Sequence, residues 1–189
     1  MEAFLVSTGI VGLAEIGDKT QLLSLLLAVR YRKPWPIILG IFVATLVNHG
    51  LAGAAGAWIT TAIDKNVLRW IVGLSFLGMA AWMLIPDKLD EQQPTKERFG
   101  IFGSTLIAFF MAEMGDKTQI ATVALAARYD AFLPVVMGTT LGILLVNVPV
   151  VLLGGRLGQR VPVRLVHAAA AVVFAVLGAV VLLNAGRAA

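Results

Sequence analysis

Six long apolar stretches follow one another along the chain, separated by short polar or proline-containing segments. An apolar run of about 20 residues is long enough to cross a bilayer as a helix. The pattern predicts helices at about residues 3–30, 36–61, 67–85, 100–127, 132–154 and 162–184. We therefore expect an all-α integral membrane protein with six transmembrane helices.

Two of these stretches, the first and the fourth, contain the same charged heptad. Glu-Ile-Gly-Asp-Lys-Thr-Gln begins at Glu15, and Glu-Met-Gly-Asp-Lys-Thr-Gln begins at Glu113. Charged side chains inside a membrane segment are costly, and they usually mark the path of an ion or substrate. The duplicated heptad is therefore the main functional candidate in the chain.

The two heptads belong to a longer internal repeat. The offset of 98 residues between Glu15 and Glu113 also relates Arg30-Tyr31 to Arg128-Tyr129. We expect one three-helix repeat at 1–85, a linker loop at 86–99 and a second repeat at 100–189. Because three spans are an odd number, the second repeat should enter from the opposite face of the membrane. Such inverted-topology repeats hold their substrate site near the bilayer midplane.

Composition agrees with the membrane class. Of the 189 residues, 59% are hydrophobic and only 14% are charged. The absence of cysteine excludes disulfides and thiolate metal sites. The net charge of +4 requires no nucleic-acid partner, because the basic residues fall mostly in short loops. The chain begins without a basic segment of the kind that precedes a cleaved signal, so we expect the first span to be retained.

Lys and Arg predict the orientation, because cytoplasmic loops carry an excess of both. One side of the predicted topology collects nine of them and the other side four. The larger set is Arg30, Arg32, Lys33, Lys88, Lys96, Arg98, Arg156, Arg160 and Arg164, and the smaller is Lys65, Arg69, Arg128 and Arg187. The bias puts the linker in the cytoplasm and both termini outside, as expected of a multi-pass membrane protein.

The spacing within each heptad suggests a cation site. On one continuous helix, residues three apart share a face, so each copy would present two acids and an amide. Two facing helices would then offer four carboxylates and two amide oxygens, which hard divalent cations prefer. Lys19 and Lys117 follow the first acid by four residues, the spacing of a helical ion pair. The candidate metal ligands in the heptads are Glu15, Asp18, Gln21, Glu113, Asp116 and Gln119.

Other polar residues have two readings. Asn48 and Asn147 occupy matching places in the second and fifth spans, where they could ligate the metal or bond neighbouring helices. Gly17 and Gly115 could break their helices or only permit close packing. We expect structural roles for His49, which has no counterpart in the other repeat, and for His167. Hydroxyls are expected to bond their own helix backbone; these are Thr20, Ser24, Thr118 and Thr122.

The heptads also carry a family resemblance. Both match the E-x-G-D-[KR]-[TS] signature, and the whole chain resembles the small membrane family of bacterial manganese exporters and Golgi calcium/manganese–proton exchangers. The resemblance implies cation/proton antiport with Glu15, Asp18, Glu113 and Asp116 as ligands. The short central loop and the lack of an N-terminal extension resemble prokaryotic members, so the resemblance implies a location in the plasma (inner) membrane of a prokaryote. Among prokaryotic members it points to manganese export.

Two other classes of function remain open at this point. A divalent cation channel could use a carboxylate ring, although inverted repeats favour alternating access. An intramembrane acid/base enzyme could use paired acids, but two identical heptads suit separate acid and base roles poorly. We therefore expect a transporter, not an enzyme, that lies in the lipid bilayer, binds a metal ion and protons, and needs no cofactor. The residues do not rank Mn²⁺ against Ca²⁺ and do not set the oligomeric state.

Overall fold

The computed structural model describes residues 1–85, 99–153 and 163–186, and this part of the chain is helical throughout, without strands. The first half contains α1 (Glu2–Glu15), α2 (Lys19–Tyr31), α3 (Pro34–Ala62) and α4 (Lys65–Trp82). The second half contains α5 (Gly100–Glu113), α6 (Lys117–Tyr129), α7 (Phe132–Leu153) and α8 (Val163–Gly186). The predicted all-helical class is confirmed.

The predicted helices agree with the observed ones except at the heptads. The predicted spans 3–30 and 100–127 are each divided into two helices, α1 with α2 and α5 with α6. Each pair consists of a 14-residue and a 13-residue helix. The expectation of one continuous helix through each heptad is therefore wrong. The predicted linker 86–99 lies outside the described residues except for Phe99.

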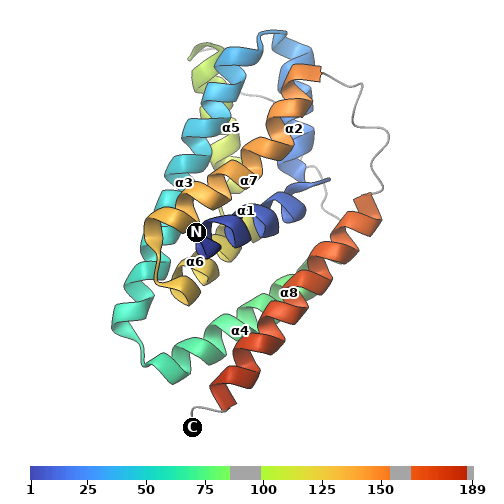
Figure 1. Cartoon of the computed structure of the whole chain (residues 1–189). Coiled ribbons are helices and arrows are strands. Elements are labelled where there is room, and N and C mark those ends of the chain that lie inside the picture. The colour runs from blue at the N-terminus through green and yellow to red at the C-terminus, as the bar shows by residue number, and fades with distance from the viewer. Residues whose placement is uncertain (86–98, 154–162, 187–189) are drawn as a thin grey trace.

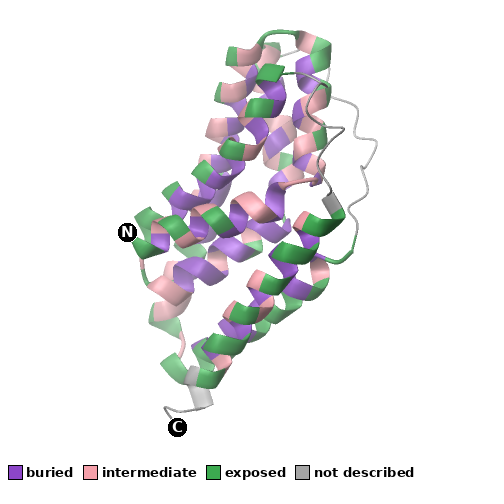
Figure 2. Cartoon of the chain, turned by 45° about the vertical axis from the view of Figure 1, so that its right-hand side comes forward, coloured by how far each residue is buried: buried purple, intermediate pink, exposed green. Residues whose placement is uncertain are grey.

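Three helices are long and apolar enough to cross a membrane by themselves, within the part of the chain that is described. They are Pro34–Ala62, Phe132–Leu153 and the segment Arg164–Leu183 of α8. Figure 2 shows buried residues on the facing sides of the helices and exposed residues on their outer sides. Many of those exposed residues are large and apolar, among them Leu26, Leu39, Leu51, Leu74, Leu145 and Leu183. Such a surface suits lipid and would be a liability in water.

The two halves of the chain pack mainly on each other. α1 lies against α7, α3 lies against α5, α6 and α7, and α4 lies against α8 along one flank of the molecule (Figure 1). Small residues permit these contacts. A Cβ atom on Gly40 of α3 would lie 2.7 Å from the Cβ of Thr105 in α5, and one on Gly138 of α7 would lie 2.5 Å from the carbonyl oxygen of Phe4 in α1. The close packing thus joins helices from opposite halves.

The α4–α8 pair breaks the similarity between the halves. It packs on α1 and α6. It makes far fewer contacts with α5, the counterpart of α1, and with α2, the counterpart of α6. At the end of α1, His167 of α8 lies with its Nε2 2.8 Å from the carbonyl oxygen of Ile16. At the end of α5, the side chain of Met114 is exposed. The pair therefore covers the end of α1 in the first heptad and α6 in the second, while the end of α5 is left uncovered.

Candidate cation site

Both heptads are sites where a helix stops and another begins. Glu15 is the last residue of α1, and Asp18 precedes the first residue of α2; Glu113 and Asp116 have the same places in the second half. The intervening glycines have φ angles of 83° at Gly17 and 76° at Gly115. Residues with a Cβ rarely adopt this left-handed conformation, whereas glycine does so freely. The sequence left two roles open for these glycines, a helix break or close packing, and the structure has the helix break.

The glutamines of the heptads close the two breaks. The backbone N–H of Gly17 donates to Gln21 Oε1 at 2.8 Å, and that of Gly115 donates to Gln119 Oε1 at 2.7 Å. These bonds satisfy backbone donors that the interrupted helices leave exposed. The expectation that a glutamine oxygen follows the two acids on one helix face is therefore wrong. Each glutamine oxygen instead accepts a hydrogen bond from the backbone at the helix break.

The first acid of each heptad is fully buried and held by a threonine. Thr20 Oγ1 donates to Glu15 Oε1, and Thr118 Oγ1 donates to Glu113 Oε2 at 2.9 Å. The expectation that these threonine hydroxyls bond their own helix backbone is wrong. Glu15 Oε2 and Glu113 Oε1 have no hydrogen-bond partner among the described residues. A buried carboxylate oxygen without a donor is costly, so these two atoms are suited to a bound cation or proton.

The second acid of each heptad pairs with the lysine of the other heptad. Lys117 Nζ lies 3.0 Å from Asp18 Oδ1, and Lys19 Nζ lies 3.3 Å from Asp116 Oδ1. The sequence spacing had suggested pairs within one heptad, between Glu15 and Lys19 and its equivalent, and that expectation is wrong. Because the helix breaks between these residues, the i,i+4 geometry does not exist. The lysines instead connect the two halves of the chain across the site.

The two cross-heptad pairs differ in their surroundings. The side chains of Lys117 and Asp18 are both fully buried. The side chain of Lys19 is 31% exposed, while that of Asp116 is almost fully buried. The asymmetry follows the packing of the α4–α8 pair, since α4 covers α6, which carries Lys117. The site is thus more open on the α2 side than on the α6 side.

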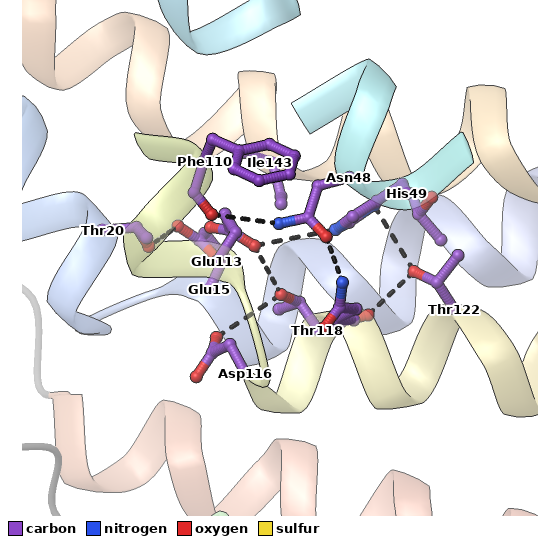
Figure 3. A network of polar contacts seen from close by, with 12 residues as sticks. Glu15, Thr20, Asn48, His49, Phe110, Glu113, Asp116, Thr118, Thr122 and Ile143 are labelled. Carbon is purple, nitrogen blue, oxygen red and sulfur yellow. Dashed lines mark hydrogen bonds and ion pairs between the residues drawn. The ribbon is translucent and has the colours of Figure 1, made fainter. Parts of the chain in front are cut away.

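The two asparagines also reach across to the opposite half. Asn147 of α7 donates from Nδ2 to Glu15 Oε1 at 2.8 Å and accepts from Ser24 Oγ at 2.6 Å. Asn48 of α3 accepts from Gln119 Nε2, and its Nδ2 lies 3.4 Å from the carbonyl oxygen of Phe110 (Figure 3). Both asparagines therefore bond neighbouring helices here. Only Asn147 bonds an acid of a heptad directly.

His49 is a component of the site that we did not expect. It follows Asn48 in α3 and is fully buried, with its Nε2 3.7 Å from Glu113 Oε2. Its Nδ1 lies 3.4 Å from Oγ1 of Thr122 in α6, a hydroxyl that also donates to the carbonyl oxygen of Thr118 at 2.8 Å. Figure 3 shows the ring linked by dashed lines to Glu113 and to Thr122. The sequence offered one signal, a histidine next to an asparagine that has a repeat counterpart.

The structure thus gathers acids, lysines and amides from both halves at one place. Within residues 1–85, 99–153 and 163–186, no three side chains of His, Asp or Glu are arranged as a ready-made metal site. This agrees with the geometry, because a lysine ammonium already lies beside each of Asp18 and Asp116. A cation bound by all four acids would have to replace these ammonium contacts.

Comparison with known proteins identifies the family. The family described as divalent cation/proton antiporter GDT1 matches residues 3–91 and 101–189, nearly the whole chain. The chain belongs to this family. It is therefore a multi-pass membrane transporter, and the family is not one of enzymes. The resemblance inferred from the heptads is confirmed.

Several curated proteins are similar to this transporter. One from Vibrio cholerae serotype O1, named "Putative manganese exporter", is 54% identical over 92% of this chain and 87% of its own length. A GDT1-like protein 3 from Oryza sativa subsp. indica is 30% identical over 92% of this chain and 71% of its own length. The GDT1-like protein sll0615 from Synechocystis is 27% identical over 70% of this chain and 73% of its own length. No solved structure matches the chain.

Proposed function

We propose that this transporter exports Mn²⁺ from the cytoplasm of a prokaryote in exchange for protons, with Ca²⁺ as the alternative cargo. The observation that carries the proposal is the meeting of two buried acid–lysine heptads from opposite halves of a chain in a divalent cation/proton antiporter family. The name of the similar protein from Vibrio cholerae supports manganese as the cargo.

The proposed ligands are the four acids of the heptads. Two ammonium groups and four ionised carboxylates, those of Glu15, Asp18, Glu113 and Asp116, leave two negative charges in the site. One divalent cation or two protons would neutralise them, so the two cargoes compete for the same oxygens. Hard divalent cations take several oxygen ligands, and the amides of Asn48, Asn147, Gln21 and Gln119 are proposed as additional ligands. Of these, we rank Asn147 first because it already bonds Glu15.

The proposed role of Lys19 and Lys117 is to hold the site in the absence of metal. Each ammonium lies beside an aspartate of the opposite heptad. Metal binding would displace the ammonium groups, and metal release would let them return. The lysines would thereby keep Asp18 and Asp116 from remaining uncompensated in a low-dielectric interior, which is costly.

We further propose that the protein works by alternating access between two inverted repeats. In this arrangement α1 with α2, and α5 with α6, each form one broken span, which gives six spans in total. Broken helices near the midplane are typical of ion sites in transporters built from such repeats. The packing of the α4–α8 pair on α1 and α6, and far less on α2 and α5, supports a mechanism in which this pair changes sides.

The proposed orientation, with both termini outside, follows from the excess of Lys and Arg in the predicted cytoplasmic segments. In that orientation α1 and α6 lie in the outer half of the membrane, and α2 and α5 lie in the inner half. The α4–α8 pair packs on α1 and α6. The conformation described would then be closed toward the outside and more open toward the cytoplasm, in agreement with the partial exposure of Lys19.

The test is transport of Mn²⁺ and Ca²⁺ in proteoliposomes, with and without an imposed pH gradient. We expect saturable Mn²⁺ flux that a pH gradient accelerates, and loss of flux in Glu15→Gln, Asp18→Asn, Glu113→Gln and Asp116→Asn. Glu2→Gln makes the same chemical change at an exposed position and serves as the control. Near-normal flux in two or more of the four variants would overturn the shared site. Flux that does not saturate and ignores the pH gradient would indicate a channel.

A further inference from the structure

His49 has one ring nitrogen whose protonation the surrounding bonds determine. The single proton of the Thr122 hydroxyl is donated to the carbonyl oxygen of Thr118. Toward His49, the hydroxyl oxygen can therefore only accept, so the ring nitrogen Nδ1 must carry the hydrogen that faces it. In a neutral imidazole the other nitrogen is then a bare acceptor. Nε2 accordingly directs a lone pair toward Glu113.

Two acceptor atoms thus face each other in a fully buried place. His49 Nε2 and Glu113 Oε2 are 3.7 Å apart, and Nε2 has no hydrogen-bond partner among the described residues. A lone pair opposite a carboxylate oxygen is unfavourable unless a positive charge lies between them. Two atoms at this separation can both lie about 2.1–2.4 Å from one cation, a normal range for metal–ligand bonds. The pair is therefore spaced as two ligands of one metal ion.

The second half of the chain supplies no such nitrogen. Asn147 corresponds to Asn48 in the repeat, and the residue after it is Val148 where the first half has His49. Glu15, the counterpart of Glu113, is bonded by the amide of Asn147. One half of the site thus offers only oxygen and amide groups, while the other half adds an imidazole.

We propose that His49 is a nitrogen ligand of the transported ion and makes the site select divalent transition-metal ions over Ca²⁺. This inference rests on the proposed function and adds to it a preference among divalent cations. Ca²⁺ takes oxygen ligands almost exclusively, whereas an imidazole nitrogen can ligate first-row transition metals, of which Mn²⁺ binds it most weakly. The nitrogen therefore strengthens binding of Mn²⁺ relative to Ca²⁺, two ions that the carboxylates alone treat similarly. The remaining ligands are the acids of the proposed site.

The direct test is pulsed electron paramagnetic resonance of Mn²⁺ bound to the purified full-length protein. The protein carries a purification tag without histidine, because the chain itself has only two histidines. We expect the modulation of a coordinated ¹⁴N nucleus in wild type, its replacement by the ¹⁵N pattern after labelling of histidine, and its loss in His49→Asn. His167→Asn is the matched control and should keep the signal, because His167 contacts the end of α1 and not Glu113.

Selectivity provides a second, independent measurement. We expect the ratio of Ca²⁺ to Mn²⁺ dissociation constants to fall by at least about tenfold in His49→Val, which copies Val148, and in His49→Asn. Loss of Mn²⁺ affinity with unchanged Ca²⁺ affinity separates a ligand from a packing residue, whose removal would weaken both. If neither variant folds, the nitrogen signal of His167→Asn, in which His49 is the remaining histidine, still decides the question.

The outcomes also separate this proposal from the proposed function. Suppose that the wild-type protein binds and transports Mn²⁺ through its acids. If it then shows no nitrogen modulation, or if both variants keep the selectivity ratio, the role of His49 alone is overturned. Wild-type protein that neither binds nor transports Mn²⁺ would overturn the proposed function.

Discussion

Removing the charge of Lys117 should destabilise the protein more than removing that of Lys19. The Lys117–Asp18 pair is fully buried at 3.0 Å, while the side chain of Lys19 in the other pair is 31% exposed. Removing one member of a fully buried pair costs about 3–5 kcal/mol, because the remaining charge stays buried. Removing Lys19 also leaves a buried aspartate, but its partly hydrated ammonium should contribute less, because solvent screens it. We therefore expect Lys117→Met to lower the free energy of unfolding by more than Lys19→Met does.

The measurement is equilibrium unfolding in detergent micelles, followed by tryptophan fluorescence. Lys65→Met, at an exposed position at the start of α4, controls for the loss of one surface ammonium. Combining Lys117→Met with Asp18→Asn should recover much of the lost stability, because no uncompensated charge then remains in the interior. This double variant separates the electrostatic cost from a simple packing defect.

Added Mn²⁺ gives a further check on the same pair. Without the ammonium of Lys117, the site holds one positive charge fewer, so Mn²⁺ should protect Lys117→Met more than wild type. A ligand that binds only the folded state at one hundred times its dissociation constant stabilises by about 2.7 kcal/mol. Equal losses of stability in Lys117→Met and Lys19→Met, or equal protection of variant and wild type by Mn²⁺, would refute the reasoning.

Three other predictions concern the breaks, the protons and the topology. Gly17→Ala and Gly115→Ala should each cost about 1–2 kcal/mol in the same unfolding assay because of their positive φ angles, with Gly9→Ala, which meets no neighbouring atom, as control. Mn²⁺ binding should release protons and weaken as pH falls, because Mn²⁺ and protons compete for the carboxylate oxygens. Titration calorimetry in buffers of different ionisation enthalpy measures the proton release, and a pH-independent Mn²⁺ affinity would contradict the competition. A cysteine at Gln92 should react with impermeant reagents from the cytoplasmic side only, and labelling of intact cells from outside would reverse the orientation.

The long helices could be predicted from the sequence because apolar length alone specifies them. α3 and α7 begin and end within two residues of the predicted bounds. The helix breaks could not be decided in the same way. A glycine inside an apolar stretch is compatible with a continuous helix or an interruption, and the deciding bonds from Gln21 and Gln119 to the backbone depend on the break itself.

The partners of the lysines and the position of His49 depend on tertiary structure. The i,i+4 rule gave a plausible local partner for Lys19, but the nearest carboxylate comes from a residue nearly one hundred positions away. The sequence predicts only a structural role for His49, because it has no repeat counterpart. Symmetry between repeats can identify residues that both halves share, but it cannot identify one that only a single half contributes.

The interleaving of the two halves has a consequence for how such a chain can be divided. α1 lies against α7, α3 against α5 and α6, and each heptad is completed by a lysine from the other half. A fragment ending before residue 86 would leave its apolar faces and its acids without their partners. Two fragments produced together should therefore reassemble into a working protein, whereas each fragment alone should fail unless a second copy of itself takes the missing place. A half-length ancestor would have faced the same requirement and could have met it only as a dimer.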